Sequence, residues 1–433
     1  MKKIVIAGTG YVGLVAGVCF AAVGHDVCCV DVDEQKVAAM QAGIAPIYEA
    51  NLTEYLKSGL ASGRLRFTTD DAGAYADADA IFIGVGTPEQ PDGSADLSYI
   101  ATVCRRIAAH VTRDCLVVVK STVPVGTNDK VEQTIRDNLK HNVKVMVASN
   151  PEFLAQGRAV WDMMHAQRIV IGTEEAEAEA QLREIYAPFN QPIVAVSRRS
   201  AEMIKYACND FLALKISYIN DIANLCELVG ANIDEVAEGM RYDPRIGEKH
   251  LKAGVGYGGS CFPKDTKALR YMAKQQGYQL KTVDAAVAVN AAQKTRLFEK
   301  ASDRFISFAG VRAAVLGVAF KAGTDDLREA PAIDNVERLL EAGASVVYYD
   351  PVAAAHFQAR FPAAIRAESP EEALTGADCC FVFTEWEQIA ALDPAAFKQH
   401  MKLPLVYDGR NLFDPQRMKA AGVAYHSIGR KSV

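Results

Sequence analysis

Several features that mark specialised classes of protein are missing from this sequence of 433 residues. No apolar stretch reaches the ~18 residues that a membrane-spanning helix requires. The formal net charge is −6, so no basic excess indicates a nucleic-acid partner, and any anion-binding site must be local. The apolar run of the N-terminal MKKIVIAGTG stops at Ile6 without a small-residue cleavage site after it, which argues against a signal peptide. We therefore expect a soluble globular protein that binds neither membranes nor nucleic acids.

The ten cysteines follow neither the spacing of metal ligands nor the regular intervals of a disulfide framework. Most of them lie in apolar runs, and four are expected to pack in strands as free thiols: Cys28, Cys29, Cys379 and Cys380. This usage is typical of a reducing compartment. We expect a cytoplasmic protein without a metal site.

The first 195 residues or so predict a parallel, doubly wound sheet. The segment KKIVIAGTGYVGLVAGVCFAAVGHDVCCVDVD has the order of a βαβ unit: an apolar run, a glycine turn, a helical run, a break at Gly24 and a second apolar run. Further buried strands are predicted within residues 78–88, 115–127 and 142–154.

A long helix is predicted next, because residues from Ser200 to Val229 include neither proline nor glycine. A helix of about thirty residues is ~45 Å long. Since this one is apolar on most of its circumference, we expect it to be buried on several sides, between two domains or against another chain. Helical segments continue to about residue 305.

The opening pattern then returns without its glycine-rich turn. Strands are predicted at 311–321, 344–351, 378–386 and 404–411, with a helix at 335–343. The predicted fold is therefore α/β, with two Rossmann-like doubly wound parallel sheets joined by a long central helix and a helical region. Two similar sheets, of which only one has the dinucleotide motif, indicate two different nucleotide-type ligands.

The motif GTGYVG follows the first strand and begins a helix, so Gly8, Gly10 and Gly13 predict a site for the pyrophosphate of a dinucleotide. Asp31 ends the second strand, where its carboxylate would bind a ribose diol and repel a 2′-phosphate, which favours NAD over NADP. The alternative is a tight turn without a ligand. Lys36 is either a ribose contact or a solvated helix lysine.

Other polar residues follow the ends of predicted strands or lie on the long helix. The loops 86–88 and 121–124 are candidates for ligand contact, although each alone is more often plain turn chemistry. Glu152 is either a site carboxylate or a surface acid. Lys205 and Asn209 are four residues apart and project from one helix face, so they form either an oxyanion clamp or a lysine that extends to water beside an unrelated amide.

The stretch YGGSCFPKD places Cys261 after Gly258 and Gly259, which allow close approach of backbone and ligand, and before a predicted helix start at Pro263. A thiol at a helix N-terminus beside Lys264 should have a lowered pKa, although a structural thiol and a helix-start acid at Asp265 remain open. A hydride acceptor and a thiolate together allow an aldehyde to be oxidised to an acid. The thiolate converts an aldehyde into a thiohemiacetal, whose oxidation gives a thioester and, after hydrolysis, an acid.

Together these residues resemble the UDP-glucose/GDP-mannose dehydrogenase family over nearly the whole chain. The motifs that carry the resemblance are GTGYVGL, VGTP, STVPVGT, NPEFL, the Lys205/Asn209 helix, DPRIG, GYGGSCFPKD and FKAGTDDLREAP. The resemblance implies NAD-dependent, four-electron oxidation of UDP-glucose at C6 to UDP-glucuronate. The alternatives are the same chemistry on GDP-mannose or a UDP-N-acetylhexosamine, and a non-catalytic dinucleotide sensor.

The resemblance also implies a division into an NAD-binding Rossmann domain (residues 1–198), a central helical region that forms a homodimer (199–305) and a UDP-sugar-binding Rossmann-like domain (306–433). The implied catalytic residues are Cys261 as nucleophile, Lys205 and Asn209 at the oxyanion, Asp265 with Thr122 for a water or proton, and Glu152 for thioester hydrolysis. The implied NAD contacts are Gly8, Gly10, Tyr11, Val12, Gly13, Asp31, Lys36, Thr87, Thr122, Lys264 and Arg328. The implied substrate contacts are Phe153, Leu154, Lys205, Asn209, Leu251, Lys252, Gly258, Lys321 and Arg245, the last reaching across the dimer.

Two loops depart from the family pattern. Gln156 stands where the family generally has a glutamate, and Ala166-Gln167 precedes Arg168 in place of proline and an acid. Neither position has assigned chemistry, so the departures bear on loop details.

Overall fold

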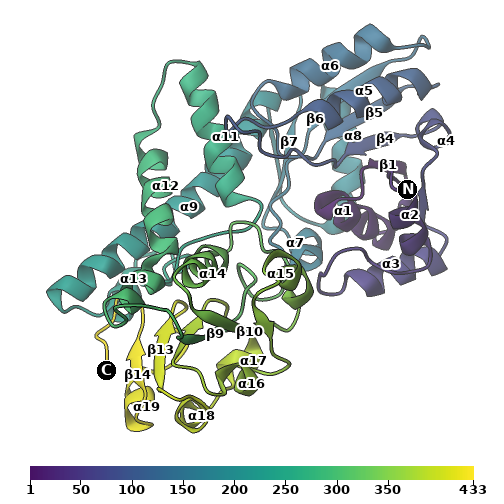
Figure 1. The fold of residues 1–433 in the computed structure, drawn as a ribbon. Helices are drawn as coiled ribbons and strands as arrows, with labels where there is room; N and C mark the ends of the chain where they lie inside the picture. Colours follow the sequence, from purple (N-terminus) through teal and green to yellow (C-terminus); the bar gives the residue numbers. More distant parts are fainter. The chain divides into compact units, whose positions relative to one another are not determined.

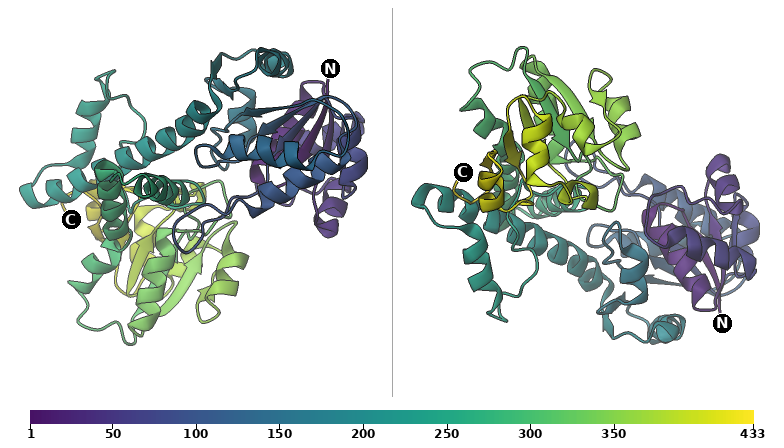
Figure 2. Two further views of the ribbon diagram at one scale, coloured as in Figure 1. Left: turned by 90° about the horizontal axis from the view of Figure 1, so that it is seen from above. Right: turned by 90° about the horizontal axis from the view of Figure 1, so that it is seen from below.

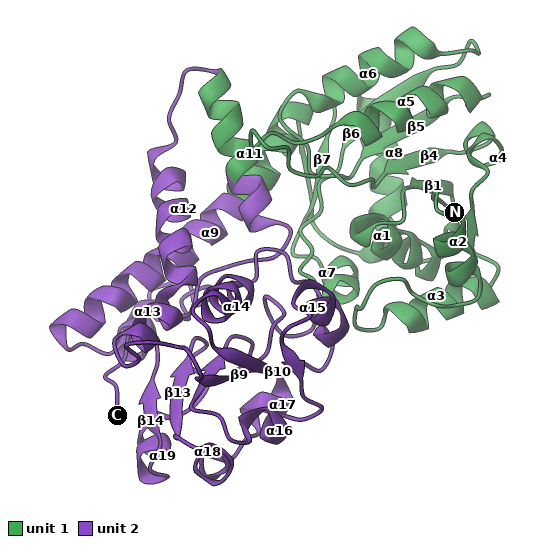
Figure 3. Ribbon diagram, in the orientation of Figure 1, with its two compact units in different colours: residues 1–208, 267–275 green, residues 209–266, 276–433 purple.

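The computed structural model describes residues 1–433 (Figure 1 and Figure 2). It divides into two compact units, coloured separately in Figure 3. Unit 1 comprises Met1–Cys208 and Lys267–Gln275, and unit 2 comprises Asn209–Thr266 and Gln276–Val433. The helices α9 (Arg198–Val229) and α11 (Phe262–Gln275) each contribute residues to both units.

Unit 1 contains an eight-stranded sheet with the order β3-β2-β1-β4-β5-β6-β7-β8. The strands are β1 Lys3–Ala7, β2 Asp26–Val30, β3 Leu65–Thr68, β4 Ala80–Ile83, β5 Cys115–Val119, β6 Val145–Ser149, β7 Ile169–Gly172 and β8 Ile193–Val196. All neighbours pair in parallel except β6 and β7, which pair antiparallel at Ser149 and Gly172. The prediction of a doubly wound sheet is confirmed. The prediction that all of its strands are parallel is wrong for the pair β6 and β7.

Helices cover both faces of this sheet (Figure 1). They are α1 Tyr11–Ala22, α2 Glu34–Gln41, α3 Leu52–Ala61, α4 Asp71–Ala76, α5 Ser98–His110, α6 Thr127–Asn138, α7 Ala159–Met164 and α8 Ala176–Tyr186, with a 3₁₀ turn η1 at Ala187–Phe189. Because successive strand residues point to opposite faces, Ile4 and Ile6 of β1 join one core with α1 and α8. Val5 and Ala7 join the other core with α5 and α6.

Unit 2 contains a six-stranded, wholly parallel sheet with the order β11-β10-β9-β12-β13-β14. Its strands are β9 Arg312–Leu316, β10 Ser345–Tyr349, β11 Ile365–Arg366, β12 Cys379–Val382, β13 Leu405–Asp408 and β14 Ala424–His426. Its helices besides α9 and α11 are α10 Ile233–Arg241, α12 Lys281–Lys294, α13 Arg296–Ser302, α14 Pro331–Glu341, α15 Ala354–Arg360, α16 Pro370–Leu374, α17 Glu387–Ala390, α18 Pro394–His400 and α19 Pro415–Ala420. The second predicted Rossmann-like sheet is confirmed.

Both sheets reverse their strand order beside their first strand, at β1/β4 and at β9/β12. Open α/β sheets bind ligands at the carboxyl ends of strands on either side of such a switch point. Each unit therefore has a position suited to a nucleotide.

The predicted long helix is confirmed as α9, which has 32 residues and is about 48 Å long. Within this single chain one apolar face of α9 is open to solvent, so its burial against another chain stays a prediction. Phe211, Tyr218 and Leu225 follow one another at intervals of seven residues and are 61%, 53% and 52% exposed. Separately, none of the helices combines the length and apolarity that crossing a membrane would require.

Candidate functional site

The turn between β1 and α1 has the geometry of a dinucleotide-binding loop. Gly8 has φ +94°, and a Cβ on Gly13 would lie 2.0 Å from the carbonyl oxygen of Gly8, so the close approach of helix and strand requires glycine. A Cβ on Gly10 would meet nothing nearer than 3.7 Å. Helix α1 begins at Tyr11 without a side-chain cap, so its first N–H groups are available to a pyrophosphate.

Asp31 lies at the end of β2 as predicted for a ribose acid. Its carboxylate accepts hydrogen bonds from the Thr9 backbone N–H (2.9 Å), the Thr9 hydroxyl and the Lys36 ammonium (3.0 Å). Burial alone would raise the pKa of Asp31, but these hydrogen bonds outweigh it and lower the pKa to about 2. A permanently charged carboxylate here fits the ribose diol of NAD and repels a 2′-phosphate. Lys36 is thus an ion-pair partner of Asp31.

The loops after β4 and β5 lie together, although each was only a weak candidate in the sequence. The buried Thr87 hydroxyl donates to the carbonyl oxygen of Thr122 at 2.8 Å. The Ser121 hydroxyl donates to the carbonyl oxygen of Val85 at 2.7 Å. These bonds hold the two loops at the carboxyl edge of the unit 1 sheet.

A buried ion pair joins Glu152, which follows β6, to Lys205 on α9. The ammonium donates to Glu152 Oε1 at 2.8 Å, and the two side chains are only 5% and 4% exposed. Burial alone would raise the pKa of Glu152, but the adjacent Lys205 charge outweighs it and lowers the pKa. Of the alternatives that the sequence left open, the surface acid and the solvent-reaching lysine are therefore wrong.

Lys120 is a second buried lysine, which was not predicted from the sequence. It directly follows β5, and its ammonium donates to Asn150 Oδ1 at 3.1 Å. Burial lowers the pKa of Lys120 to about 8, although the charge of Glu152 opposes this shift. A lysine at the end of the apolar run CLVVV was the available signal, since an ammonium at the end of a buried strand needs partners.

The phenyl ring of Phe153, a predicted substrate contact, lies near two cations of unit 1. The Arg168 guanidinium is 3.7 Å from the ring centroid and the Lys205 ammonium is 5.6 Å from it. Such contacts fix the orientation of an aromatic ring.

In unit 2, Cys261 occupies the N-cap position of α11 and is half-buried. Its carbonyl oxygen accepts the first helical hydrogen bond from the Asp265 N–H at 2.9 Å, so the thiol lies at the positive end of the helix dipole. The pKa of Arg328 is raised, first by its hydrogen bonds to Asp326 and also by the charge of Cys261. The guanidinium of Arg328 therefore lies within electrostatic reach of the sulfur.

Asp265 is buried and both of its carboxylate oxygens have partners. Oδ2 accepts from Asn209 Nδ2 at 2.6 Å, and Oδ1 accepts from the Lys264 ammonium at 2.6 Å. Unit 2 thus brings together five predicted residues: Cys261, Lys264, Asp265, Asn209 and Arg328. The ammonium of Lys264, which the sequence placed beside the thiol, is bound to Asp265.

The glycines before Cys261 are explained by packing inside unit 2. A Cβ on Gly258 would lie 2.3 Å from the carbonyl oxygen of Glu329, and one on Gly259 would lie 2.7 Å from the ring of Phe320. The Gly259 N–H also donates to the carbonyl oxygen of Arg328 at 2.8 Å. The interpretation of both glycines as room for a ligand is therefore corrected, because protein atoms occupy that space.

Other predicted substrate contacts differ in exposure. Leu251 is buried and Lys252 is exposed. Lys321 is half-buried, with its ammonium over the ring of Phe320. The guanidinium of Arg245 is 88% exposed and pairs with Asp243 at 2.6 Å. An exposed arginine of this kind is free to contact a second molecule.

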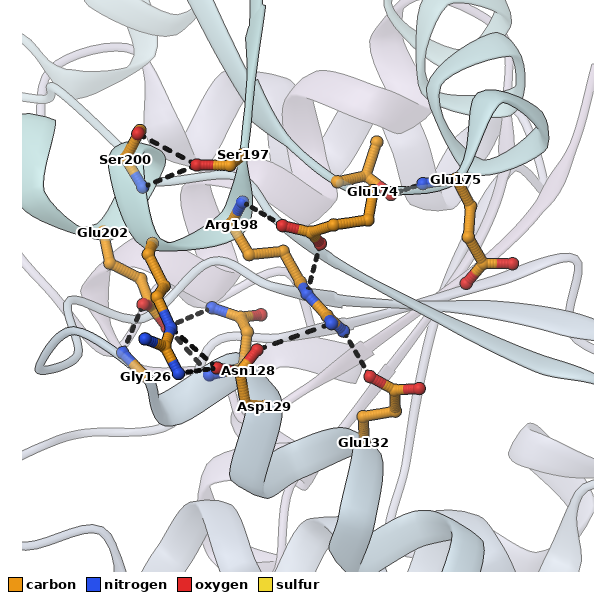
Figure 4. A network of polar contacts seen from close by, with 12 residues as sticks. Gly126, Asn128, Asp129, Glu132, Glu174, Glu175, Ser197, Arg198, Ser200 and Glu202 are labelled. Atoms are coloured by element: carbon orange, nitrogen blue, oxygen red, sulfur yellow. Dashed lines mark hydrogen bonds and ion pairs between the residues drawn. The ribbon is translucent and has the colours of Figure 1, made fainter.

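A polar network within unit 1 fixes the start of α9 (Figure 4). The carboxylate of the buried Glu202 accepts from the backbone N–H of Gly126 (2.6 Å) and of Asn128 (2.7 Å) at the start of α6. Arg198 pairs with Glu132 (2.7 Å) and Glu174 (2.6 Å). Glu202 lies one helical turn before Lys205, so the network ties that lysine to the loop that includes Thr122.

Three family models match consecutive parts of the chain. All belong to the UDP-glucose/GDP-mannose dehydrogenase family: the NAD binding domain at residues 2–190, the central domain at 199–292 and the UDP binding domain at 314–415. The chain belongs to this family.

Curated members of the UDP-glucose/GDP-mannose dehydrogenase family are similar to the chain along its whole length. "UDP-glucose 6-dehydrogenase YwqF" of Bacillus subtilis (strain 168) is 47% identical, with 100% of this chain and 98% of the relative covered. The UDP-glucose 6-dehydrogenase of Rhizobium meliloti (strain 1021) is also 47% identical, with 99% of each covered. A UDP-glucose dehydrogenase structure from Pyrobaculum islandicum aligns with a TM-score of 0.94 at 37% identity, covering 100% of this chain and 98% of the other.

Proposed function

We propose that the chain catalyses the NAD-dependent oxidation of UDP-glucose at C6 to UDP-glucuronate, in two steps with Cys261 as the nucleophile. Family membership and full-length similarity to UDP-glucose 6-dehydrogenases support the reaction. The observation that carries the role of Cys261 is its position at the N-cap of α11, with Arg328 within reach of its charge. Both features stabilise a thiolate.

NAD, when bound at the β1 turn, supplies the hydride acceptor for both oxidations. Lys205 Nζ and Asn209 Nδ2, one turn apart on α9, are donors that stabilise negative charge on the C6 oxygen of the sugar. Cys261 Sγ then bonds to the carbonyl carbon of the aldehyde, and the same donors hold the oxygen of the thiohemiacetal. Its oxidation yields a thioester on Cys261.

Hydrolysis completes the reaction. Water adds to the thioester carbon, the bond from carbon to Cys261 Sγ breaks, and the product leaves as a carboxylate. Asp265, held between Asn209 and Lys264, has a fixed orientation for binding the water, and we assign Thr122 to the same task. Glu152, held ionised by Lys205, takes part as an acceptor of the proton that the water loses.

The test is the stoichiometry of NADH per UDP-glucose at exhaustion of the sugar. We expect two NADH per sugar, and we expect Cys261→Ser to stop after or within the first turnover. Cys208→Ser is the matched control, because Cys208 is the other cysteine that is not fully buried. A ratio of one, or a Cys261→Ser variant with normal turnover, would contradict the proposal.

The choice of sugar nucleotide has a separate test. The relatives at 47% identity are named for UDP-glucose, which favours it over GDP-mannose and UDP-N-acetylhexosamines. We expect initial rates with the three substrates, measured side by side, to be highest with UDP-glucose. A higher kcat/KM for either alternative would reassign the substrate and leave the chemistry at Cys261 unchanged.

We further infer a cytoplasmic homodimer. All ten cysteines are free thiols, as expected in a reducing compartment. The exposed apolar stripe of α9, formed by Phe211, Tyr218 and Leu225, is suited to a second copy of the chain. In this proposal residues 199–305 form the dimerisation region between an NAD-binding domain (1–198) and a UDP-sugar-binding domain (306–433), and Arg245 contacts the second copy.

A further inference from the structure

Asp210 follows Asn209 on α9 and has a buried carboxyl group without a partner. The residue is 6% exposed, and neither carboxylate oxygen has a hydrogen-bond partner. No cation is paired with it. A carboxylate in such a place loses its hydration without compensation, so the uncharged acid is the favoured form.

The neighbouring Asp265 has the opposite environment. Its two oxygens accept from Asn209 and from the Lys264 ammonium. Burial raises the pKa of Asp210 to about 7, and the negative charge of Asp265 contributes to the increase. Of these two nearby carboxyl groups, the one on α11 has hydrogen-bond donors at both oxygens and the one on α9 has none.

We propose that Asp210 is a positioning residue that holds a proton beside Asp265 and thereby determines how far into the alkaline range the enzyme works. The proposal rests on the proposed roles of Cys261, Asn209 and Asp265. While Asp210 is uncharged, the charge of Lys264 is compensated by Asp265 and that of Arg328 by Asp326. The N–H of the Asn209 amide that does not bond to Asp265 can then stabilise negative charge.

Ionisation of Asp210 places an uncompensated negative charge within the group. That charge opposes every anion formed nearby, namely the Cys261 thiolate and the oxyanion of the thiohemiacetal. The group is uncharged below its pKa and charged above it, so the loss of rate develops as the pH rises through neutrality. In acidic solution Asp210 is uncharged and has no effect on the rate.

The test is the ratio of kcat for Asp210→Asn to kcat for the wild-type enzyme as a function of pH. The amide has the same shape and cannot ionise. We expect a constant ratio at pH ~6 and below, and a rise of several-fold between pH ~6 and ~9. The ratio isolates the effect of the Asp210 charge, including its effect on the ionisation of Cys261, because the two proteins differ only in that charge.

Asp303→Asn is the matched control, since it removes an exposed carboxyl of unit 2, and its ratio should stay constant over the whole range. A constant ratio for Asp210→Asn would overturn the proposal. Both proteins should still produce two NADH per UDP-glucose. A failure of that stoichiometry would contradict the proposed function, whereas the pH dependence of the ratio concerns Asp210 alone.

A second measurement does not depend on turnover. Because the folded protein favours the uncharged form, ionisation of Asp210 opposes folding as the pH rises above the pKa of an unfolded aspartate, and the effect is complete above neutrality. The apparent melting temperature of Asp210→Asn minus that of the wild type should therefore increase between pH ~5 and ~8. If the asparagine variant does not fold, Asp210→Ala serves both measurements, and a difference independent of pH would again overturn the proposal.

Discussion

Asp31 shows how a single residue can define a cofactor preference. Its carboxylate is ionised at every physiological pH because Thr9 and Lys36 donate to it. Replacing Asp31 by Asn removes the charge that we propose binds a ribose diol and repels a 2′-phosphate. The loss of a charge-assisted hydrogen bond costs about 1.5–3 kcal/mol, so we expect KM for NAD to rise roughly 10- to 100-fold. Rates with NADP relative to NAD should increase.

The measurement is initial velocity against each cofactor at saturating UDP-glucose. Asp26→Asn, at the other end of β2 in an exposed pair with Arg66, should leave both KM values unchanged. An unaltered preference in Asp31→Asn would place the ribose elsewhere.

At this scale the sequence predicted those residues whose type and spacing identify a chemistry, such as Gly8, Asp31 and Cys261. It could not predict the isolation of Asp210 or the burial of Lys120, because both depend on which elements pack around them. It also misinterpreted Gly258, since the carbonyl group of Glu329 that fills the adjacent space lies about seventy residues further along the chain.

At the scale of elements, the capping of α6 by Glu202 holds two segments of the site together. Glu202→Gln would turn one acceptor oxygen into an NH₂ group and leave a buried N–H of Gly126 or Asn128 without a partner. An unsatisfied buried donor costs about 1–3 kcal/mol, which lowers the apparent melting temperature by roughly 2–10 °C for a unit of this size. We also expect KM for NAD to increase, because the loop with Thr122 ends at Gly126.

Differential scanning fluorimetry and cofactor titration test this prediction. The control is Glu179→Gln, which weakens an exposed pair with Arg183 and should change stability by less than about 0.5 kcal/mol. Equal melting temperatures for the two variants would show that the capping of α6 contributes nothing.

The elements themselves were predicted unequally well. Buried strands with continuous apolar runs, such as β1, β5 and β12, were predicted from the sequence. The edge strands β3 and β8 were not predicted, because they are short and include exposed side chains. The antiparallel pairing of β7 with β6 could not be predicted, because pairing direction follows from the path of the connection and leaves no mark in the strand residues.

At the scale of the whole molecule, the apolar stripe of α9 predicts self-association. Leu225→Glu would place a charge within the proposed apolar contact between two copies, which is strongly unfavourable. We expect the wild type to sediment as a dimer and the variant to sediment as a monomer at the same concentration. Leu403→Glu, at an exposed leucine in the loop before β13, should leave the proposed dimer intact, and a dimeric Leu225→Glu variant would place the interface elsewhere.

The packing of the thiols has a practical result for covalent chemistry. Burial raises the pKa of seven cysteines, namely Cys19, Cys28, Cys29, Cys104, Cys115, Cys379 and Cys380. Cys226 is also buried, which leaves Cys208 and Cys261 accessible to reagents. In a Cys208→Ser background an alkylating agent would therefore attach to one atom of this cysteine-rich protein. That single attachment point is suited to a spectroscopic label and to inhibitors that react through an electrophile.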